Sequence, residues 1–454
     1  PASAEIPDEG SIWLGTNIYR GKERPVYFDN IEDRLRHMYV VGKTGSGKSF
    51  FIQSMALQDI MDGRGVAFID PHGDAIDWLL ERIPPERMED VIVFDPSDSE
   101  RPVALNIIEA YNEQDRHRVV NSFIGLLIKL FDPHGQGIVG PRLERAVRNA
   151  MLTAMEAGEG FTLVEVVRIL ISPKFVEKLI PKIKDEMVKQ YWLEEQAQTA
   201  QYHKSEILGY IVSKFDRFVT NKLMRNIVGQ SKSSFDFRKV MDEQKILLIN
   251  LSKGIIGEEN AQFLGLLIVP KILSAAMSRA NIEKDARSPF FLYVDEFQNF
   301  ATEDFAQILS EARKYGLGLI VANQYISQVQ ESIRDAVFGN IGSIVSFKVG
   351  VNDAQYLKSE FYPIFDENDL VNLENINAYA KLLVNSEYPP PFSLATWFDN
   401  NRFPSDKRTS DMIKQLSRLR YGRDRELVER EMIDRSAGEE ATSVADVSSP
   451  VNPY

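Results

Sequence analysis

Short, continuous apolar runs alternate along the chain with stretches of helical periodicity. Such runs are typical of strands buried on both faces, as in a parallel sheet covered by helices. Many of them end in polar residues or turn signals, and they lie at 38–41, 65–70, 91–95, 245–250, 290–295, 317–322, 343–348 and 379–384. We therefore predict an α/β fold whose core is a mainly parallel sheet.

The segment between the third and fourth of these runs has a different pattern. Residues 107–234 show apolar positions at helical spacing, such as Ile124, Leu127 and Phe131, and no convincing strand. This pattern predicts an all-α insertion that divides the α/β core. The expected organisation is N-terminal strands packing on the core at 1–36, core parts at 37–106 and 235–400, the insertion at 107–234, and a charged helix with a disordered tail at 401–454.

Composition narrows the range of functions. The 454 residues include no cysteine, which excludes disulfides, zinc ribbons and thiol catalysis. The formal charge is -13, so nucleic-acid binding would depend on a local basic patch. Residues 107–234 contain 18 Lys+Arg and 15 Asp+Glu, a net of +3, and form the relatively basic part of the chain. The longest apolar stretches, 123–131 and 261–278, are interrupted by charged residues or proline, so no membrane-spanning helix is expected.

A phosphate-binding loop follows the first core strand. The segment after 38–41 matches G-x-x-x-x-G-K-[ST] in full and precedes a predicted helix at 48–62. Glycines allow backbone N–H groups to face phosphate oxygens, Lys48 reaches the β- and γ-phosphates, and the Ser49 hydroxyl is a Mg²⁺ ligand. An ordinary glycine-rich turn is the alternative. We predict ATP and Mg²⁺ as cofactors, with nucleotide held by Gly42, Thr44, Gly45, Ser46, Gly47, Lys48 and Ser49.

Two carboxylates directly follow the apolar run 290–294. Asp295 would hold Mg²⁺, and Glu296 would act as the general base that activates an attacking water. A kinase has no need of such a water-activating glutamate, so the pair favours hydrolysis. The alternative is a strand that ends in solvated acids.

Polar residues near the next strand are further candidates for the site. Asn323 and Gln324 follow the run 317–322, and we expect Gln324 to contact the γ-phosphate or the lytic water, whereas a turn-capping amide is the alternative. Arg313 precedes the same run and could stabilise the transferring phosphoryl group of a neighbouring subunit, or could instead be a solvated cation at a helix end. Arg334 and Lys348 are weaker candidates for that role.

A further motif follows the second strand. Asp70 lies where ligands bind in open α/β folds, and His72 lacks a second histidine or cysteine at ligand spacing. We therefore assign a loop-shaping role to the segment 70–74.

The order of these motifs resembles the HerA/FtsK superfamily of hexameric pumping ATPases. The strings Asp-Pro-His-Gly-Asp, Asp-Glu-Phe-Gln-Asn-Phe and Arg-Lys-Tyr-Gly, with the helical insertion, are most similar to the type IV secretion coupling ATPases of the TraG/TraD class. The resemblance implies a RecA-like core, a ring of six, ATP-driven movement of DNA, and contacts with a secretion channel and relaxosome proteins. It also implies that Lys48, Ser49, Asp295, Glu296 and Gln324 act as described above and that Arg313 is the arginine finger.

Coupling proteins usually have an N-terminal membrane anchor, and this sequence shows none. We therefore expect a cytoplasmic protein at the inner face of the membrane, attached through an upstream anchor or a partner. Candidate DNA contacts are cations near a strand exit or in the insertion, with solvated helix faces as the alternative: Lys253, Lys204, Lys214, Arg217, Lys222 and Arg225. A denser basic run has interleaved glutamates, which favours a solvated or subunit-contacting helix; it consists of Arg418, Arg420, Arg423, Arg425 and Arg430.

Three functional hypotheses are compatible with the sequence. The first is an ATP-driven DNA translocase of the coupling-protein type. The second is a related ATPase that energises protein export or pilus assembly. The third is a nucleotide-gated adaptor that recruits secretion substrates with little turnover.

Overall fold

The computed structural model describes residues 2–158, 160–197, 217–396 and 403–445, together with residues 209 and 215. The chain forms two compact units, each made of three segments. The first unit comprises Pro1–Phe94, Tyr111–Gly135 and Asp236–Ser417, and the second comprises Asp95–Ala110, Gln136–Phe235 and Arg418–Tyr454. The first unit contains the sheet and the phosphate loop, and the second is helical.

An eleven-stranded sheet forms the centre of the first unit, in the order β2-β1-β11-β10-β9-β3-β8-β7-β4-β6-β5. Its strands from β9 to β5 run parallel, and those from β2 to β10 are joined by antiparallel pairing. The predicted α/β fold with a mainly parallel sheet is therefore confirmed. The strands are β1 (Trp13–Tyr19), β2 (Lys22–Tyr27), β3 (Met38–Val41), β4 (Gly65–Asp70), β5 (Val91–Phe94), β6 (Ile246–Asn250), β7 (Phe290–Val294), β8 (Leu317–Asn323), β9 (Ser343–Ser346), β10 (Asn377–Lys381) and β11 (Phe392–Ala395).

The antiparallel edge differs from the expectation. The N-terminal strands were expected to pack on the core, but β1 pairs with β11 and so extends the same sheet. The last strand was expected at 379–384, whereas β10 spans Asn377–Lys381 and β11 follows it. Residues along β10 alternate between buried and partly exposed, as expected for a strand in the antiparallel part of a sheet that is covered mainly on one face. A search for continuous apolar runs does not place such strands accurately.

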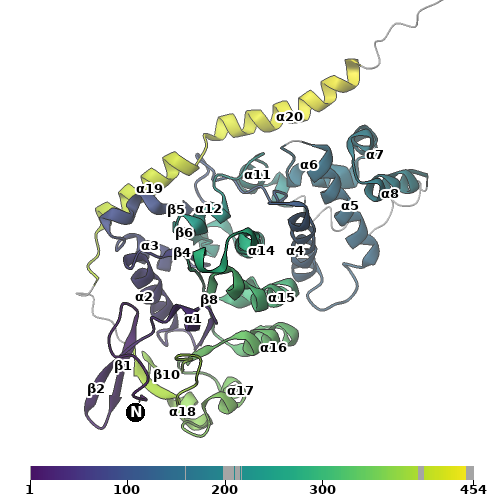
Figure 1. Ribbon diagram of the computed structural model, residues 1–454. Helices are drawn as coiled ribbons and strands as arrows, with labels where there is room; N and C mark the ends of the chain where they lie inside the picture. Colours follow the sequence, from purple (N-terminus) through teal and green to yellow (C-terminus); the bar gives the residue numbers. More distant parts are fainter. Residues whose placement is uncertain are drawn as a thin grey trace, which may run out of the picture. The chain divides into compact units, whose positions relative to one another are not determined.

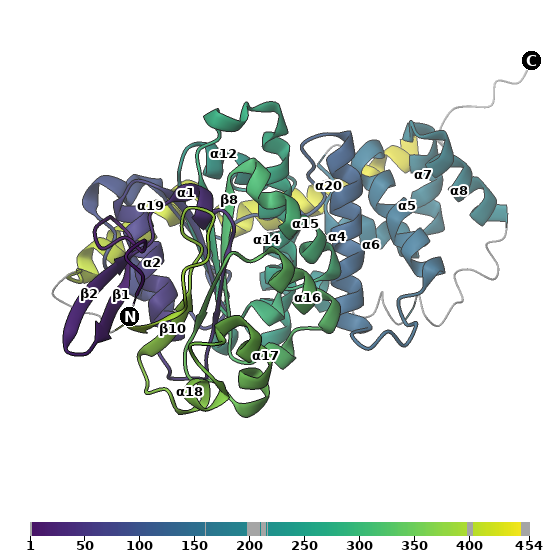
Figure 2. The same ribbon diagram turned by 60° about the horizontal axis from the view of Figure 1, so that its bottom comes forward.

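Helices cover both faces of the sheet (Figure 2). On one face α2 and α3 contribute to the core cluster, which includes Phe51 and Ile52 of α2, Ile76 of α3, and Val40 and Phe291 of the sheet. On the other face lie α14, α15 and α16. The helices of this unit are α1 (Ile31–Arg34), α2 (Lys48–Met61), α3 (Asp74–Leu80), α4 (Glu113–Phe131), α12 (Phe237–Asp242), α13 (Lys253–Ile256), α14 (Glu258–Ser278), α15 (Glu303–Ala312), α16 (Glu331–Asn340), α17 (Val351–Phe361), α18 (Glu367–Asn372) and most of α19 (Lys407–Tyr421).

The apolar helix α14 is a core helix. The segment Glu258–Asn281 is long and apolar enough to cross a membrane, but 83% of its apolar window is buried inside the protein. Its neighbours include α4, whose Asp115 carboxylate accepts a hydrogen bond from the Ser274 hydroxyl of α14. Because α4 packs on α14, residues 113–131 belong to the first unit, whereas the sequence analysis assigned them to the helical insertion.

The second unit is helical in the part that the structure describes (Figure 1). A capping box between Thr162 and Glu165 begins α6, which explains the start of that helix. The helices of this unit are α5 (Pro141–Ala157), α6 (Leu163–Ile171), α7 (Pro173–Leu179), α8 (Glu186–Ala197), α11 (Lys222–Val228) and α20 (Arg425–Ala445). In the part of the chain that the structure describes, short 3₁₀ turns lie at Pro85–Asp90, Ile180–Lys182, Arg279–Asn281, Lys284–Ala286, Phe297–Asn299, Arg313–Tyr315 and Ile326–Gln328.

The C-terminal region forms two helices where one charged helix was expected. The break falls at Gly422, which forms an isolated β-bridge with Val103. A Cβ at Gly422 would lie 2.6 Å from the carbonyl oxygen of Arg101, so only glycine fits this close approach. The second helix, α20, continues to Ala445, so the expected disorder from residue 436 onward is wrong for 436–445. Residues 446–454 lie outside the described residues.

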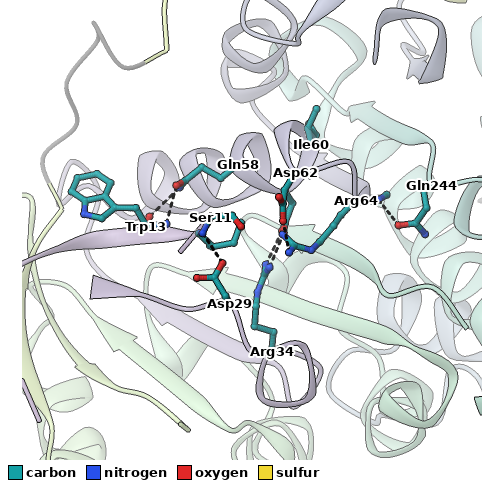
Figure 3. A network of polar contacts seen from close by, with 12 residues as sticks. Ser11, Trp13, Asp29, Arg34, Gln58, Ile60, Asp62, Arg64 and Gln244 are labelled. Atoms are coloured by element: carbon teal, nitrogen blue, oxygen red, sulfur yellow. Dashed lines mark hydrogen bonds and ion pairs between the residues drawn. The ribbon is translucent and has the colours of Figure 1, made fainter. Parts of the chain in front are cut away.

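A buried ion pair fastens the phosphate-loop helix to the sheet (Figure 3). The Arg34 guanidinium donates two hydrogen bonds of 2.7 Å to the carboxylate of Asp59, which lies on α2. The Tyr293 hydroxyl on β7 donates to the same carboxylate at 2.5 Å, and the Arg34 guanidinium lies 4.0 Å from the Phe291 ring centroid. Helix α2 and strand β7, which carry the two halves of the site described next, are thereby held together.

Candidate active site

The phosphate loop connects β3 to α2 and has the backbone shape that phosphate binding requires. Gly45 and Gly47 have φ values of 76° and 109°, which L side chains rarely adopt. A Cβ at Gly42 would lie 2.6 Å from the Phe347 Cβ, so the loop approaches β9's exit too closely for another residue. A cleft of about 510 Å³ opens beside the loop and is lined by Lys43, Thr44, Gly45, Gly47, Lys48, Ser49, Phe50, Gln53, His72, Glu296 and Gln324.

The two predicted carboxylates meet Lys48 at this cleft. The Lys48 ammonium lies 2.5 Å from an Asp295 oxygen and 3.5 Å from a Glu296 oxygen. Asp295 follows β7, and β8 lies between β3 and β7, so parallel strands bring these distant residues to one sheet edge. All three side chains are buried. The predicted meeting of the phosphate loop and the carboxylate pair is therefore seen in the structure.

Glu296 is held in one orientation by two amides. The Gln324 side chain donates to one carboxylate oxygen at 2.9 Å, and the Gln298 side chain donates to the other at 2.6 Å. The two amides thereby fix the position of a carboxylate that could accept a proton from water. Gln324 lies where the sequence analysis expected it. The role of Gln298 was not predicted, because its pairing depends on the turn that follows Glu296.

Other cleft residues carry a weaker sequence signal. Gln53 lies on α2 four residues after Ser49, and this spacing puts both on one face of the helix. The phosphate-loop motif specifies neither Phe50 nor Gln53, so the sequence analysis missed them. Asn323 does not line the cleft; its main-chain oxygen accepts a hydrogen bond from the Gly42 N–H at 3.3 Å.

Asp70 and His72 shape the loop beside the cleft. The Asp70 carboxylate accepts hydrogen bonds of 2.8 Å from the backbone N–H groups of His72 and Ala75. Burial raises the pKa of the Asp70 carboxyl, these two bonds oppose the rise, and the nearby Asp295 adds to it. His72 lines the cleft, but the described residues contain no group of three or more His, Cys, Asp or Glu that could hold a metal ion.

The arginine-finger candidate lies away from the chain's own cleft. Arg313 precedes the amino end of β8, whereas the phosphate loop lies at the carboxyl edge of the sheet. Its guanidinium lies 3.5 Å from a Glu32 carboxylate oxygen. Arg334 lies over the Tyr356 ring at 5.0 Å, and Lys348 accepts a main-chain hydrogen bond from Lys43 at 2.9 Å. A finger role for any of them needs a second subunit and stays a prediction.

The residues of the cleft fit Mg²⁺ and a nucleoside triphosphate. Magnesium prefers oxygen ligands, keeps several waters, and usually binds one or two protein groups together with phosphates. Ser49 and Asp295 supply such oxygens. The Ser46 hydroxyl within the phosphate loop is buried and lacks a hydrogen-bond partner among the described residues, which leaves it available to a phosphate oxygen. The fold and this site together define a P-loop nucleotide-binding core whose cleft residues suit ATP and Mg²⁺.

Comparison with known proteins shows which families the chain resembles. Residues 12–136 match the family described as the helicase HerA central domain, and residues 177–358 match the family described as type IV secretory system conjugative DNA transfer. The type 4 coupling protein DotL of Legionella pneumophila is 22% identical over an alignment of 404 residues, and the match covers 75% of this chain and 50% of DotL. The chain thus spans about half the length of the curated relative it matches. Together with the motifs above, these matches indicate that the chain is similar to P-loop ATPases of the type IV secretion coupling-protein class.

Solved structures share the fold. The bacterial conjugative coupling protein TrwB matches with a TM-score of 0.57 at 15% identity, covering 83% of this chain and 87% of TrwB. TrwB in complex with ADP and Mg²⁺ matches with a TM-score of 0.56 at 16% identity, covering 87% of this chain and 90% of that one. VirB4 of Thermoanaerobacter pseudethanolicus matches with a TM-score of 0.56 at 15% identity, covering 88% and 99%. The RecA-like core predicted from the resemblance is therefore confirmed.

Proposed function

We propose that this protein is the ATP-hydrolysing motor of a type IV secretion or conjugation system and that it translocates DNA as a ring of six. The observation that carries the proposal is the arrangement of Glu296, which two amides orient beside the Lys48 ammonium. A protein that only binds nucleotide has no need of a carboxylate held in this way. The family matches support the choice of a secretion ATPase, and TrwB and DotL are both titled coupling proteins.

Each site residue has a distinct task in hydrolysis. Ser49 and Asp295 would hold Mg²⁺, which would supply positive charge at the phosphates when bound. Lys48 leaves Asp295 for the β- and γ-phosphates when nucleotide binds. The Glu296 carboxylate accepts a proton from the attacking water. Gln324, which contacts Glu296 directly, orients that water and responds to the γ-phosphate.

A ring would complete the site. The Arg313 side chain is half-exposed and forms a 3.5 Å surface ion pair with Glu32, so a neighbouring subunit's cleft could accept it at little cost. The proposed partners are DNA, a type IV secretion channel and relaxosome proteins. The proposed location is the cytoplasmic face of the inner membrane, with attachment through an upstream anchor or a partner.

Lys253 is our preferred DNA contact in the first unit. It begins α13 at the carboxyl end of β6, and its N–H donates to the Pro71 carbonyl at 3.1 Å. The N–H of Leu251 donates to the Asp70 carbonyl at 2.9 Å. The segment that carries Lys253 is thus tied to the loop whose His72 lines the cleft, which gives a short route between nucleotide and DNA.

The other basic candidates are less informative. In the second unit Lys222 is exposed and Arg225 is partly buried. Arg217 forms further interactions within the described part of the chain, and Lys204 and Lys214 lie outside it. The C-terminal arginines form internal ion pairs, since Arg418 binds Asp98 and Glu100, and Arg423 binds Glu431. These pairs support a structural role for that run rather than DNA binding.

The first experiment measures steady-state ATP hydrolysis with and without single- and double-stranded DNA, at low and moderate salt. We expect stimulation by DNA that weakens as salt rises, because phosphate contacts release counterions. Glu296→Gln should lower the rate by about 10²- to 10⁴-fold, the usual contribution of a general base. Glu283→Gln, at an exposed position outside the cleft, is the matched control. An ATP hydrolysis rate that does not change with DNA would favour protein cargo instead of DNA. An unchanged hydrolysis rate in Glu296→Gln would refute the motor.

A second experiment tests the DNA contact. Lys253→Ala should reduce stimulation by DNA while basal hydrolysis stays near the wild-type rate, because Lys253 lies outside the cleft. Lys284→Ala removes an exposed cation from a 3₁₀ turn and serves as the control. Equal stimulation of Lys253→Ala and wild type would exclude this contact without affecting the ATPase.

A further inference from the structure

Ile376 has an unusual backbone conformation next to the phosphate loop. It lies between α18 and β10, and its φ is 62°. The non-glycine residues with positive φ in the described part of the chain are Arg20, His37, Gln244, Glu296, Ile376, Asn385 and Ser386, and only Ile376 is β-branched. A β-branched residue is a genuine outlier in this region, where glycine or asparagine would be accommodated more easily. Backbone geometry therefore does not explain why an isoleucine occupies this position.

The backbone of Ile376 is tied to the phosphate loop and to the sheet edge. Its N–H donates to the Ser46 carbonyl at 2.8 Å. Its own carbonyl accepts from the Thr396 N–H at 2.9 Å and from the Thr396 hydroxyl at 2.7 Å. Both polar backbone groups of Ile376 thus form hydrogen bonds within the protein, and only its apolar side chain is left to contact a ligand.

Core packing does not explain the side chain. Ile376 is 49% exposed, yet it touches the loop: a Cβ at Gly47 would lie 3.5 Å from Ile376 Cγ2. Gly47 immediately precedes Lys48 at the start of α2, where phosphates bind. An apolar, half-exposed surface is therefore fixed against the edge of the phosphate site.

The sheet order gives the direction in which a nucleotide extends. The γ-phosphate end faces Glu296 and Gln324, which follow β7 and β8. Strands β9 and β10 lie on the opposite side of β3, and Ile376 immediately precedes β10. The nucleoside end must leave the phosphate loop away from the carboxylates, which is toward Ile376.

We propose that the Ile376 side chain is the apolar platform for the nucleobase of the bound nucleotide. The strained backbone holds that side chain over the phosphate loop, and the platform becomes covered only when a nucleoside is present. The inference rests on the nucleotide-binding part of the proposed function and is independent of the cargo. A contact of this kind binds the flat apolar face of a base and contributes nothing to the binding of phosphates alone.

The test compares two ligands, Mg-ATP and Mg-tripolyphosphate, by isothermal titration calorimetry. Ile376→Gly removes the side chain and suits the positive φ, so the hydrogen bond to Ser46 can persist. We expect the dissociation constant for ATP to rise about fivefold, from the loss of roughly half an isoleucine of apolar contact. The constant for tripolyphosphate should stay unchanged. Ile364→Gly, at a residue that is 48% exposed between α17 and α18, is the matched control and should bind both ligands normally.

The outcomes separate the platform from other roles. An equal loss of affinity for both ligands would show that Ile376 only positions the phosphate loop. Unchanged affinity for both would show that Ile376 does not contact the nucleotide. Either result overturns the proposal. Wild-type protein that binds neither ligand would refute the nucleotide site itself. If Ile376→Gly fails to fold, Ile376→Asn, which also tolerates positive φ, gives the same comparison.

Discussion

A buried histidine should make the stability of the first unit depend on pH. His37 precedes β3, is 3% exposed, and has a φ of 67°. Its Nδ1 accepts from the Leu319 N–H at 3.1 Å, so in the neutral ring its Nε2 donates to the Leu309 carbonyl at 3.2 Å. Burial lowers the pKa of His37 to about 4; the bond to Leu309 opposes this shift, and the charge of Arg313 reinforces it. The folded protein therefore keeps this histidine neutral under mildly acidic conditions.

The magnitude follows from proton linkage. Near pH 7 His37 is mostly neutral in both the folded and the unfolded chain, so it contributes little to the pH dependence of the free energy of unfolding. Between its unfolded pKa of 6.5 and its folded pKa of about 4, the unfolded chain takes up a proton that the folded chain does not, so stability falls as pH falls. The full effect is about 3 kcal/mol below pH 4, and about 2 kcal/mol of it should be present near pH 5.

The assay is urea unfolding of wild type and His37→Asn at about pH 7.5 and about pH 5. Asparagine tolerates the positive φ of this site but does not titrate in this range. Wild type should lose about 2 kcal/mol more than the variant on acidification, since every other group titrates in both proteins. His117→Asn, at an exposed position on α4, should behave like wild type. Parallel losses in wild type and His37→Asn would refute the reasoning.

Three further substitutions test the site and its support. Arg34→Ala leaves the Asp59 carboxylate buried without its bidentate partner and should destabilise the protein by about 3–5 kcal/mol, measured by chemical denaturation. Gly42→Ala places a Cβ 2.6 Å from the Phe347 Cβ, so equilibrium binding of Mg-ATP should be lost or strongly weakened in a calorimetric titration. Lys48→Ala removes the ammonium that reaches the phosphates, so saturating Mg-ATP should raise the thermal midpoint of wild type but not of this variant.

The parts of the fold that the sequence predicted well share one property. Strands β3, β4, β6, β7 and β8 are buried on both faces, so each is a continuous apolar run that stands out from the helical periodicity around it. Their parallel arrangement then places every strand exit at one edge, which explains why residues far apart in sequence could be assigned to one site. The strands of the antiparallel part lack this property: β1 and β2 fall within the predicted N-terminal strands, but β10 was misplaced and β11 was missed.

The parts of the site that escaped prediction depend on tertiary contacts. Gln298 has an ordinary loop sequence, and its function is visible only when its amide is found 2.6 Å from the Glu296 carboxylate. Ile376 is an unremarkable apolar residue until its φ and its contact with the phosphate loop are known. The finger role of Arg313 depends on a residue contact between two chains and stays a prediction.

The turn at Glu296 explains how two adjacent carboxylates serve one cleft. Successive side chains of a strand point to opposite faces, so a strand continuing past Asp295 would direct its two carboxylates apart. Glu296 instead has a φ of 50° and a ψ of 46°, and its N–H donates to the Asp295 carboxylate at 2.9 Å. A left-handed conformation costs a glutamate about 1–2 kcal/mol. In this conformation Asp295 contacts Lys48 and Glu296 accepts the two amide bonds, so the two adjacent carboxylates lie side by side at the cleft.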